Sequence, residues 1–210
     1  MKRTVITVFC LLTGALVFAQ QAAVREGNLL YREGRFDDAA KKYDEAIAAD
    51  PADLTASYNR ANALAKKGDK AAARDEYNKL LEKAGTLQSN NSLRERALYD
   101  RGVLEQQEKQ LAESIRSWKD ALKLDPADTL ARENLQKALR EKKQQDAQQQ
   151  QQQKQQPKDK KDQKQPPPPQ SKLNQKQVEQ LLKALEQKEK EVQKKMQQRT
   201  GAPNQPDKDW

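Results

Sequence analysis

The chain has 210 residues, of which 34% are charged and only 5% are aromatic, and its formal net charge is +9. Its mean hydropathy of −1.16 is low for a globular domain, so part of the chain should lie outside any packed core. The sequence contains no histidine, and its single cysteine is Cys10. These absences exclude Cys–His nucleophiles, histidine bases and Cys/His zinc sites, so we expect no catalytic residues, no metal site and no cofactor.

The first 19 residues have the composition of a secretory leader. Lys2 and Arg3 precede an apolar run of 15 residues, from Val5 to Ala19, and small residues stand at positions 17 and 19. The run is shorter than the roughly 20 residues that span a bilayer as a helix. We therefore predict a signal peptide over 1–19, cleavage before Gln20 and a periplasmic mature protein without Cys10. An uncleaved anchor is the alternative.

A pattern of small and aromatic residues then occurs three times. The second copy follows the first by 34 residues, and the third follows the second by 41, which is one period plus a seven-residue insertion. The small residues that keep this register are Gly27, Ala61 and Gly102, then Ala39, Ala73 and Ser114, and the aromatic residues are Tyr43, Tyr77 and Trp118. Small residues allow two helices to approach closely, and the rings are expected to fill the space between helices.

This pattern resembles the tetratricopeptide repeat, a helix–turn–helix unit of 34 residues. The resemblance implies an all-α solenoid with repeats over about 20–53, 54–87 and 95–128. Gly34 and Gly68 are expected in the turns, and Asp50-Pro51 and Asp125-Pro126 should end second helices. Solenoids of this kind bind other proteins in a groove and rarely perform chemistry, so an enzyme is not expected.

The end of the solenoid is predicted from capping signals. Ser92 and Glu95 form a candidate capping box for the third repeat. Asp128 or Thr129 can cap a final helix over 129–143, whose apolar stripe and charged outer face would close the solenoid. The repeat domain is therefore expected to span 20–143.

Residues 144–173 form a low-complexity segment of Gln, Lys and Pro, including Pro166–Pro169. No apolar residue larger than Ala147 lies within 144–165, so we expect a disordered linker there, although the glutamine run can extend the preceding helix by a few turns. The four prolines predict a stiff, extended spacer.

An amphipathic helix is predicted over 174–198, and a polar tail follows over 199–210. The apolar stripe of this helix consists of Val178, Leu181, Leu182, Leu185, Val192 and Met196. A single helix has no core of its own, so the stripe is exposed unless it docks. The sequence leaves three alternatives: binding to a partner protein, folding back onto the solenoid, or marginal helicity without a partner.

The distribution of charge argues against nucleic acid as a partner. Residues 20–139 carry 21 Lys+Arg and 21 Asp+Glu, so the positive surplus lies in the leader and the C-terminal third. A nucleic-acid-binding domain would place that surplus on the folded part, with aromatic residues for base stacking. We interpret the surplus as a solvated linker, with at most peripheral contact to an anionic membrane surface.

In tetratricopeptide solenoids, the first helix of each pair lines the concave face. In this register the candidate groove residues are Asn28, Tyr31, Tyr58, Asn59, Asn62, Arg96 and Tyr99. Asn amides can hold an extended backbone, and Arg can bind a carboxylate. Members that bind chaperone C-termini use two Lys, two Asn and an Arg; here Asn28, Asn59 and Arg96 match, but Val24 and Asp100 replace a Lys and the Arg. Asp100 argues against that use.

The whole architecture, and above all the segments 180–196 and 208–210, resembles the BatC-type proteins of the Bacteroides aerotolerance (Bat) operon. That resemblance implies a periplasmic adaptor that scaffolds membrane-anchored von Willebrand A-type Bat proteins and supports tolerance of oxygen or oxidative stress. A periplasmic chaperone or assembly factor is the first alternative. An envelope tether that uses the basic C-terminal part is the second.

Overall fold

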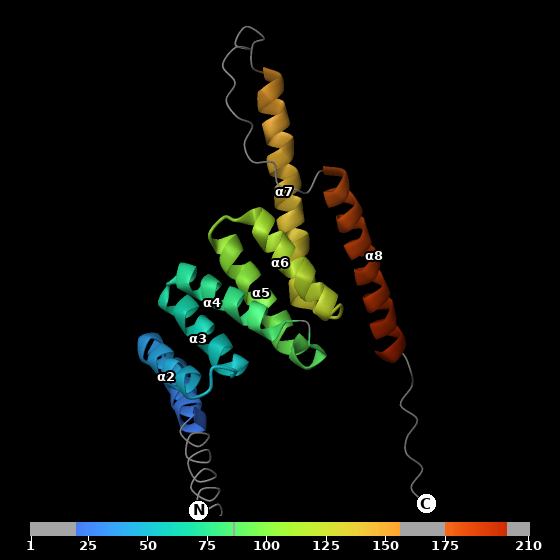
Figure 1. The fold of residues 1–210 in the computed structure, drawn as a ribbon. Helices are drawn as coiled ribbons and strands as arrows, with labels where there is room; N and C mark the ends of the chain where they lie inside the picture. The colour runs from blue at the N-terminus through green and yellow to red at the C-terminus, as the bar shows by residue number, and fades with distance from the viewer. Residues whose placement is uncertain (1–19, 86, 156–174, 201–210) are drawn as a thin grey trace, which may run out of the picture. The chain divides into compact units, whose positions relative to one another are not determined.

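The structure is a computed structural model that describes residues 20–85, 87–155 and 175–200. Within these ranges every regular element is helical, which confirms the all-α prediction (Figure 1). A first helix includes residues 20–32. The following elements are α2 (Phe36–Ala49), α3 (Leu54–Lys67), α4 (Lys70–Ala84), the 3₁₀ turn η1 (Gln88–Asn90), α5 (Asn91–Gln107), α6 (Leu111–Leu124), α7 (Thr129–Gln155) and α8 (Gln175–Thr200).

The helices up to α6 form a solenoid of three antiparallel pairs. Each helix packs on the next, from α2 through α6, and α3 also contacts α5, so the first helices of successive repeats are neighbours. The chain divides into two compact units at Ala131 and Arg132, and each is described by itself. The predicted leader, the prolines of the linker and residues 201–210 of the polar tail lie outside the described residues, whereas α8 continues to Thr200.

The turns inside the three pairs have the same backbone geometry. Gly34 and Gly68 have φ of 78° and 99°, as predicted for left-handed turn residues. In the third repeat the equivalent residue is Lys109, with φ of 61°. A left-handed conformation costs a non-glycine residue about 1–2 kcal/mol, so the third turn is formed at the expense of local backbone strain.

Proline and aspartate set the remaining helix ends. α2 stops at Ala49 and α6 at Leu124, just before Asp50-Pro51 and Asp125-Pro126, as predicted. The carboxylate of Asp53 accepts hydrogen bonds from two amides at the start of α3. Asp128 does the same for α7, at 2.9 and 3.1 Å, which confirms Asp128 as the cap.

The rings of Tyr43, Tyr77 and Trp118 are the largest buried side chains of the solenoid, with exposed fractions of 1%, 1% and 0%. Each ring comes from the second helix of its repeat and packs against the first helix of the same repeat. The Tyr43 hydroxyl donates to Asn28 Oδ1 at 2.7 Å, and the Tyr77 hydroxyl donates to Asn62 Oδ1. In the third repeat the Trp118 indole N–H donates to the Tyr99 carbonyl at 3.2 Å. The burial was predicted, whereas these hydrogen bonds were not.

Glycine is required where two of these rings meet the first helix. A Cβ atom on Gly27 would lie 2.7 Å from Cε1 of Tyr43, and one on Gly102 would lie 2.7 Å from Nε1 of Trp118. Both distances are shorter than any ordinary van der Waals contact. The middle repeat has Ala61 at the equivalent position, and it is fully buried.

A polar ladder also repeats along the solenoid. Equivalent positions on the first helices hold Glu26, Arg60 and Arg101. Glu26 pairs with Lys42 at 3.3 Å, and Arg60 pairs with Glu76 at 2.6 Å. Arg101 donates to Ser117 in its own repeat and to Asn78 in the preceding one. Arg60 also pairs with Asp44 of the preceding repeat at 2.5 Å, so the ladder joins each pair internally and successive pairs to each other.

One prediction at the end of a helix is wrong. α5 begins at Asn91 with Asn90 as its N-cap, so Ser92 lies inside the helix and no capping box forms with Glu95. A 3₁₀ turn immediately precedes α5. α7 continues past residue 143 to Gln155, which is the extension into the glutamine run that the sequence allows, because glutamine is a good helix former and no proline occurs between Thr129 and Pro157.

In the second unit, α8 lies against α7. The Lys143 Nζ atom lies 3.0 Å from Glu179 Oε1, and the Gln136 amide donates to Glu189 at 3.3 Å. The later residue of α8, Glu189, contacts the earlier residue of α7, Gln136, so the two helices are antiparallel. On α8, Val178 and Leu185 are 1% and 7% exposed and share a helix face with Glu189. The apolar stripe is therefore partly covered within the chain.

We predict that Gly27→Ala and Gly102→Ala each lower the free energy of unfolding by about 1–3 kcal/mol, because the added methyl group overpacks the ring beneath it. Urea unfolding followed by circular dichroism measures the change. Helix propensity alone would give the opposite sign, since Ala is favoured over Gly by about 1 kcal/mol. The reverse change, Ala61→Gly, should cost only the difference in helix propensity. If Gly27→Ala or Gly102→Ala stabilised the protein, the close contact between ring and glycine would be contradicted.

Candidate functional site

Polar side chains from three successive first helices form two linked groups, which together we call the first-helix row. It consists of Asn28, Asn59, Tyr58, Asp100 and Arg96. The Asn59 amide donates to Asn28 Oδ1 at 3.2 Å, which joins the first repeat to the second. Asn28 and Asn59 are exposed or half-exposed, so their remaining amide hydrogens can reach a ligand. The structure thus brings together two of the predicted groove residues.

The second and third repeats meet at Tyr58. Its hydroxyl donates to Asp100 Oδ2 at 2.6 Å, and the guanidinium of Arg96 lies over its ring, 4.9 Å from the ring centre. Burial raises the pKa of Asp100, while the Tyr58 hydrogen bond and the charges of Arg96 and Lys66 oppose that rise. Burial, followed by the charge of Asp100, raises the pKa of Tyr58. Tyr58 therefore stays a neutral donor, and the ring face beneath Arg96 is already occupied.

The remaining predicted groove residues have mixed roles. Tyr31 is half-buried, and burial followed by the charge of Asp100 raises its pKa. Asn62 uses its oxygen to hold Tyr77, so that oxygen is engaged in packing. The backbone carbonyl of Tyr99 holds Trp118. Asn28 likewise holds Tyr43, so two of the three predicted asparagines support the core as well as facing outward.

Sequence reasoning missed Lys66, which faces the same row. It lies 34 residues after Arg32, so the two cations occupy equivalent places in successive repeats. The repeat register therefore contained the signal. What the register could not give was the proximity of Lys66 to Asp100, because that proximity crosses from one repeat to the next.

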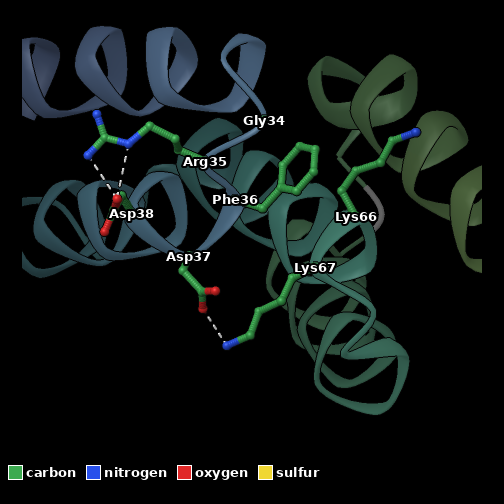
Figure 2. A pocket seen from close by; sticks show the side chains of 7 residues that line it. All are labelled: Gly34, Arg35, Phe36, Asp37, Asp38, Lys66 and Lys67. Atoms are coloured by element: carbon green, nitrogen blue, oxygen red, sulfur yellow. Dashed lines mark hydrogen bonds and ion pairs between the residues drawn. The ribbon is translucent and has the colours of Figure 1, made fainter.

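An open pocket of about 390 Å³ lies beside the turn of the first repeat and the end of α3. It is lined by residues 34–38 with Lys66 and Lys67, and Figure 2 shows their side chains. Lys67 pairs with Asp37 at 2.5 Å, and Arg35 pairs with Asp38 at 2.9 Å. The Phe36 ring lies edge-on to Tyr31 with 5.3 Å between ring centres, so the pocket adjoins Tyr31, another of the predicted groove residues.

Other classes of site were sought in the described ranges. No group of acidic or cysteine side chains there is arranged to hold a metal ion. None of the helices described has the length and apolar character needed to cross a membrane.

The C-terminal helix residues belong to the second unit. Val178 and Leu185 are buried, Leu181 and Leu182 are half-buried, and Val192 is 36% exposed. The Met196 side chain lies outside the described residues. Partner binding by this stripe remains a prediction, and it requires the contacts with α7 to open.

A pair of carboxyl groups lies near the end of the row. Burial, a hydrogen bond with Asp128 and the charges of Asp128 and Asp125 together raise the pKa of Glu95 to about 7, against the opposing charge of Arg96. The protonated form donates to Asp128, which at the same time caps α7. Two adjacent carboxylates repel each other when both are ionised.

We therefore predict that the melting temperature falls as the pH rises from about 5 to about 8. Because the folded-state pKa of Glu95 lies above its ordinary value, its contribution is full below about pH 4.5 and is lost as the pH passes 7. Glu95→Gln keeps a donor for Asp128 without the charge, so its melting temperature should fall less. Parallel thermal melts test this, and an equal fall in both proteins would refute the assignment.

The comparisons with known proteins agree with this architecture. Residues 24–87 match the family model described as tetratricopeptide repeat. A comparison with curated protein sequences gives no match. Among solved structures, the chain is similar to "Crystal structure of MamA", at 14% identity and a TM-score of 0.57, over 83% of this chain and 81% of that one.

Two further structures are similar over the repeat region. One is the Arabidopsis OM64 TPR domain, at 21% identity and a TM-score of 0.53, over 60% of this chain and 98% of that one. The other is the first TPR of Spaghetti (RPAP3) bound to the HSP90 peptide SRMEEVD, at 24% identity and a TM-score of 0.51, over 57% and 89%. Residues 24–87 thus carry tetratricopeptide repeats, and the solenoid has the fold of that repeat class.

Proposed function

We propose that this chain is a non-enzymatic adaptor that binds a partner protein along the first-helix row. The tetratricopeptide-repeat fold suggests a protein–protein interaction module. The observation that carries the proposal is the row itself: Asn28 is hydrogen-bonded to Asn59, and Tyr58 contacts both Asp100 and Arg96, so each group joins neighbouring first helices. A row of fixed amides, a hydroxyl and a guanidinium suits an extended peptide segment better than a reacting small molecule.

The finer part of the proposal concerns the cellular setting. The leader and the resemblance of segments 180–196 and 208–210 to BatC-type proteins support an adaptor in the cell envelope that scaffolds von Willebrand A-type Bat proteins. In that setting the complex would contribute to tolerance of oxygen or oxidative stress, with α8 as a second contact surface. A chaperone or assembly factor that engages clients transiently is the alternative, because a polar row also permits weak, varied binding.

The groove is tested by photo-crosslinking in the native cell envelope. A photoreactive residue at Asn59 should yield a discrete crosslinked partner, because Asn59 lies in the row and is only half-buried. The same residue at Arg116, which is exposed on the second helix α6, is the matched control and should yield little product.

Mass spectrometry of the crosslinked product separates the candidate functions. A single von Willebrand A-type membrane protein is expected for the Bat-type adaptor. Many substoichiometric clients would favour the chaperone instead, and equal yields at Asn59 and Arg116 would contradict binding along the row.

The envelope location is tested by fractionation and intact mass of the native protein. Cleavage before Gln20 should give a periplasmic chain that starts at that residue. A membrane-retained chain beginning at Met1 would show that the leader is an anchor, and a cytoplasmic protein would refute the proposed setting altogether.

A further inference from the structure

Three exposed cations belong to the first-helix row or flank it: Arg96 is part of the row, and Arg32 and Lys66 flank it. Arg96 covers the Tyr58 ring at the row's third repeat. Arg96 and Lys66 both oppose the burial that raises the pKa of Asp100, and Arg32 opposes the burial that raises the pKa of Tyr43 to about 12. Arg32 follows Asn28 by four residues on the first helix, and Lys66 follows Asn59 by seven residues on α3, so both cations share a helix face with the row.

None of these three cations has an ion-pair partner among the described residues, whereas cations nearby are paired. In Figure 2, Lys67 reaches Asp37 and Arg35 reaches Asp38, while Lys66 at the same pocket makes no such contact. Cations of the polar ladder are paired as well. The row therefore carries exposed positive charge that has no ion-pair partner among the described residues, whereas the cations of the adjacent pocket and of the ladder are paired.

The only carboxylate within the row is Asp100, and it is held by the Tyr58 hydroxyl. Glu95 flanks Arg96, but it shares a hydrogen bond with Asp128. Three cations thus face one internally bonded carboxylate, although residues 20–139 as a whole carry equal numbers of positive and negative side chains. Charge is segregated on this face of a neutral solenoid.

We infer that the first-helix row binds an extended acidic protein segment, recognised through its Asp and Glu side chains and not through a terminal carboxylate. This inference rests on the proposed function. Charge complementarity supplies the attraction, since separate cations along successive repeats match carboxylates spaced along a chain. The asparagine amides of the same row can hold the segment's backbone.

The position of Asp100 explains why a terminal carboxylate is not the target. A carboxyl terminus is a single point that two or more converging cations would hold. Lys66 and Arg96 both approach Asp100, so the place where they converge already contains the chain's own carboxylate. Partner carboxylates must therefore bind the cations one by one.

Nucleic acid is disfavoured by the same geometry. Single-stranded nucleic acid binds through bases stacked on aromatic rings. The face of Tyr58 is covered by Arg96, and the Tyr43 and Tyr77 rings are buried in the core. The row therefore offers charge without a free stacking surface.

Fluorescence anisotropy of the full chain with a fluorescein-labelled oligoglutamate peptide tests the inference. The peptide is prepared with a free and with an amidated carboxyl end, and both forms should bind alike. Arg32→Glu with Lys66→Glu should weaken binding by about tenfold or more, because like charges then face the peptide. Lys41→Glu with Arg116→Glu makes the same change in net charge on second helices and should have little effect.

Asp100→Asn keeps an acceptor for the Tyr58 hydroxyl and removes the row's negative charge, so it should strengthen binding severalfold. Unchanged affinity in Arg32→Glu/Lys66→Glu, a clear preference for the free carboxyl end, or tighter binding of oligolysine or single-stranded DNA would each overturn the inference. If oligoglutamate fails to bind while Asn59 still crosslinks a partner, the row's function stands and its acidic specificity is wrong. If both fail, the proposed function falls as well.

Discussion

The solenoid depends on one contact that is repeated three times. An aromatic ring from the second helix of each repeat is buried against the first helix of the same repeat. Tyr43, Tyr77 and Trp118 lie at equivalent positions and are almost completely buried. Each also donates a hydrogen bond to that helix, so the polar atom of the ring is satisfied inside the core. Without these rings, each pair would lose its largest fully buried side chain.

The same contact shapes the candidate binding row. The acceptors for Tyr43 and Tyr77 are Asn28 and Asn62, which also belong to the outward-facing set on the first helices. The tyrosine hydroxyls hold these amides in one orientation. Because their rotamers are already restricted, little side-chain entropy is lost when a partner binds. Core and surface are therefore coupled through two asparagines, and a variant at either one would change both.

The third repeat departs from the first two at several points with one common effect. Val103 stands where the other repeats have Asn28 and Asn62, and the Trp118 indole uses the Tyr99 carbonyl instead. Lys109 takes the place of the turn glycine, and Asp100 brings a carboxylate into the row. The row thus changes from amide side chains in the first repeat to charged side chains in the third. Its two ends therefore differ chemically, so a bound segment would be favoured in one orientation.

Sequence alone determined the repeat register, the turn glycines, the proline exits and the burial of the three rings, because each depends on spacing within a single helix pair. Tertiary structure decided the contacts that cross between repeats, namely Asn28 with Asn59, Tyr58 with Asp100, and Lys66 near that carboxylate. It also decided that α8 lies along α7. Periodicity places a residue on a helix face, whereas its neighbour on the next helix depends on how the two helices pack.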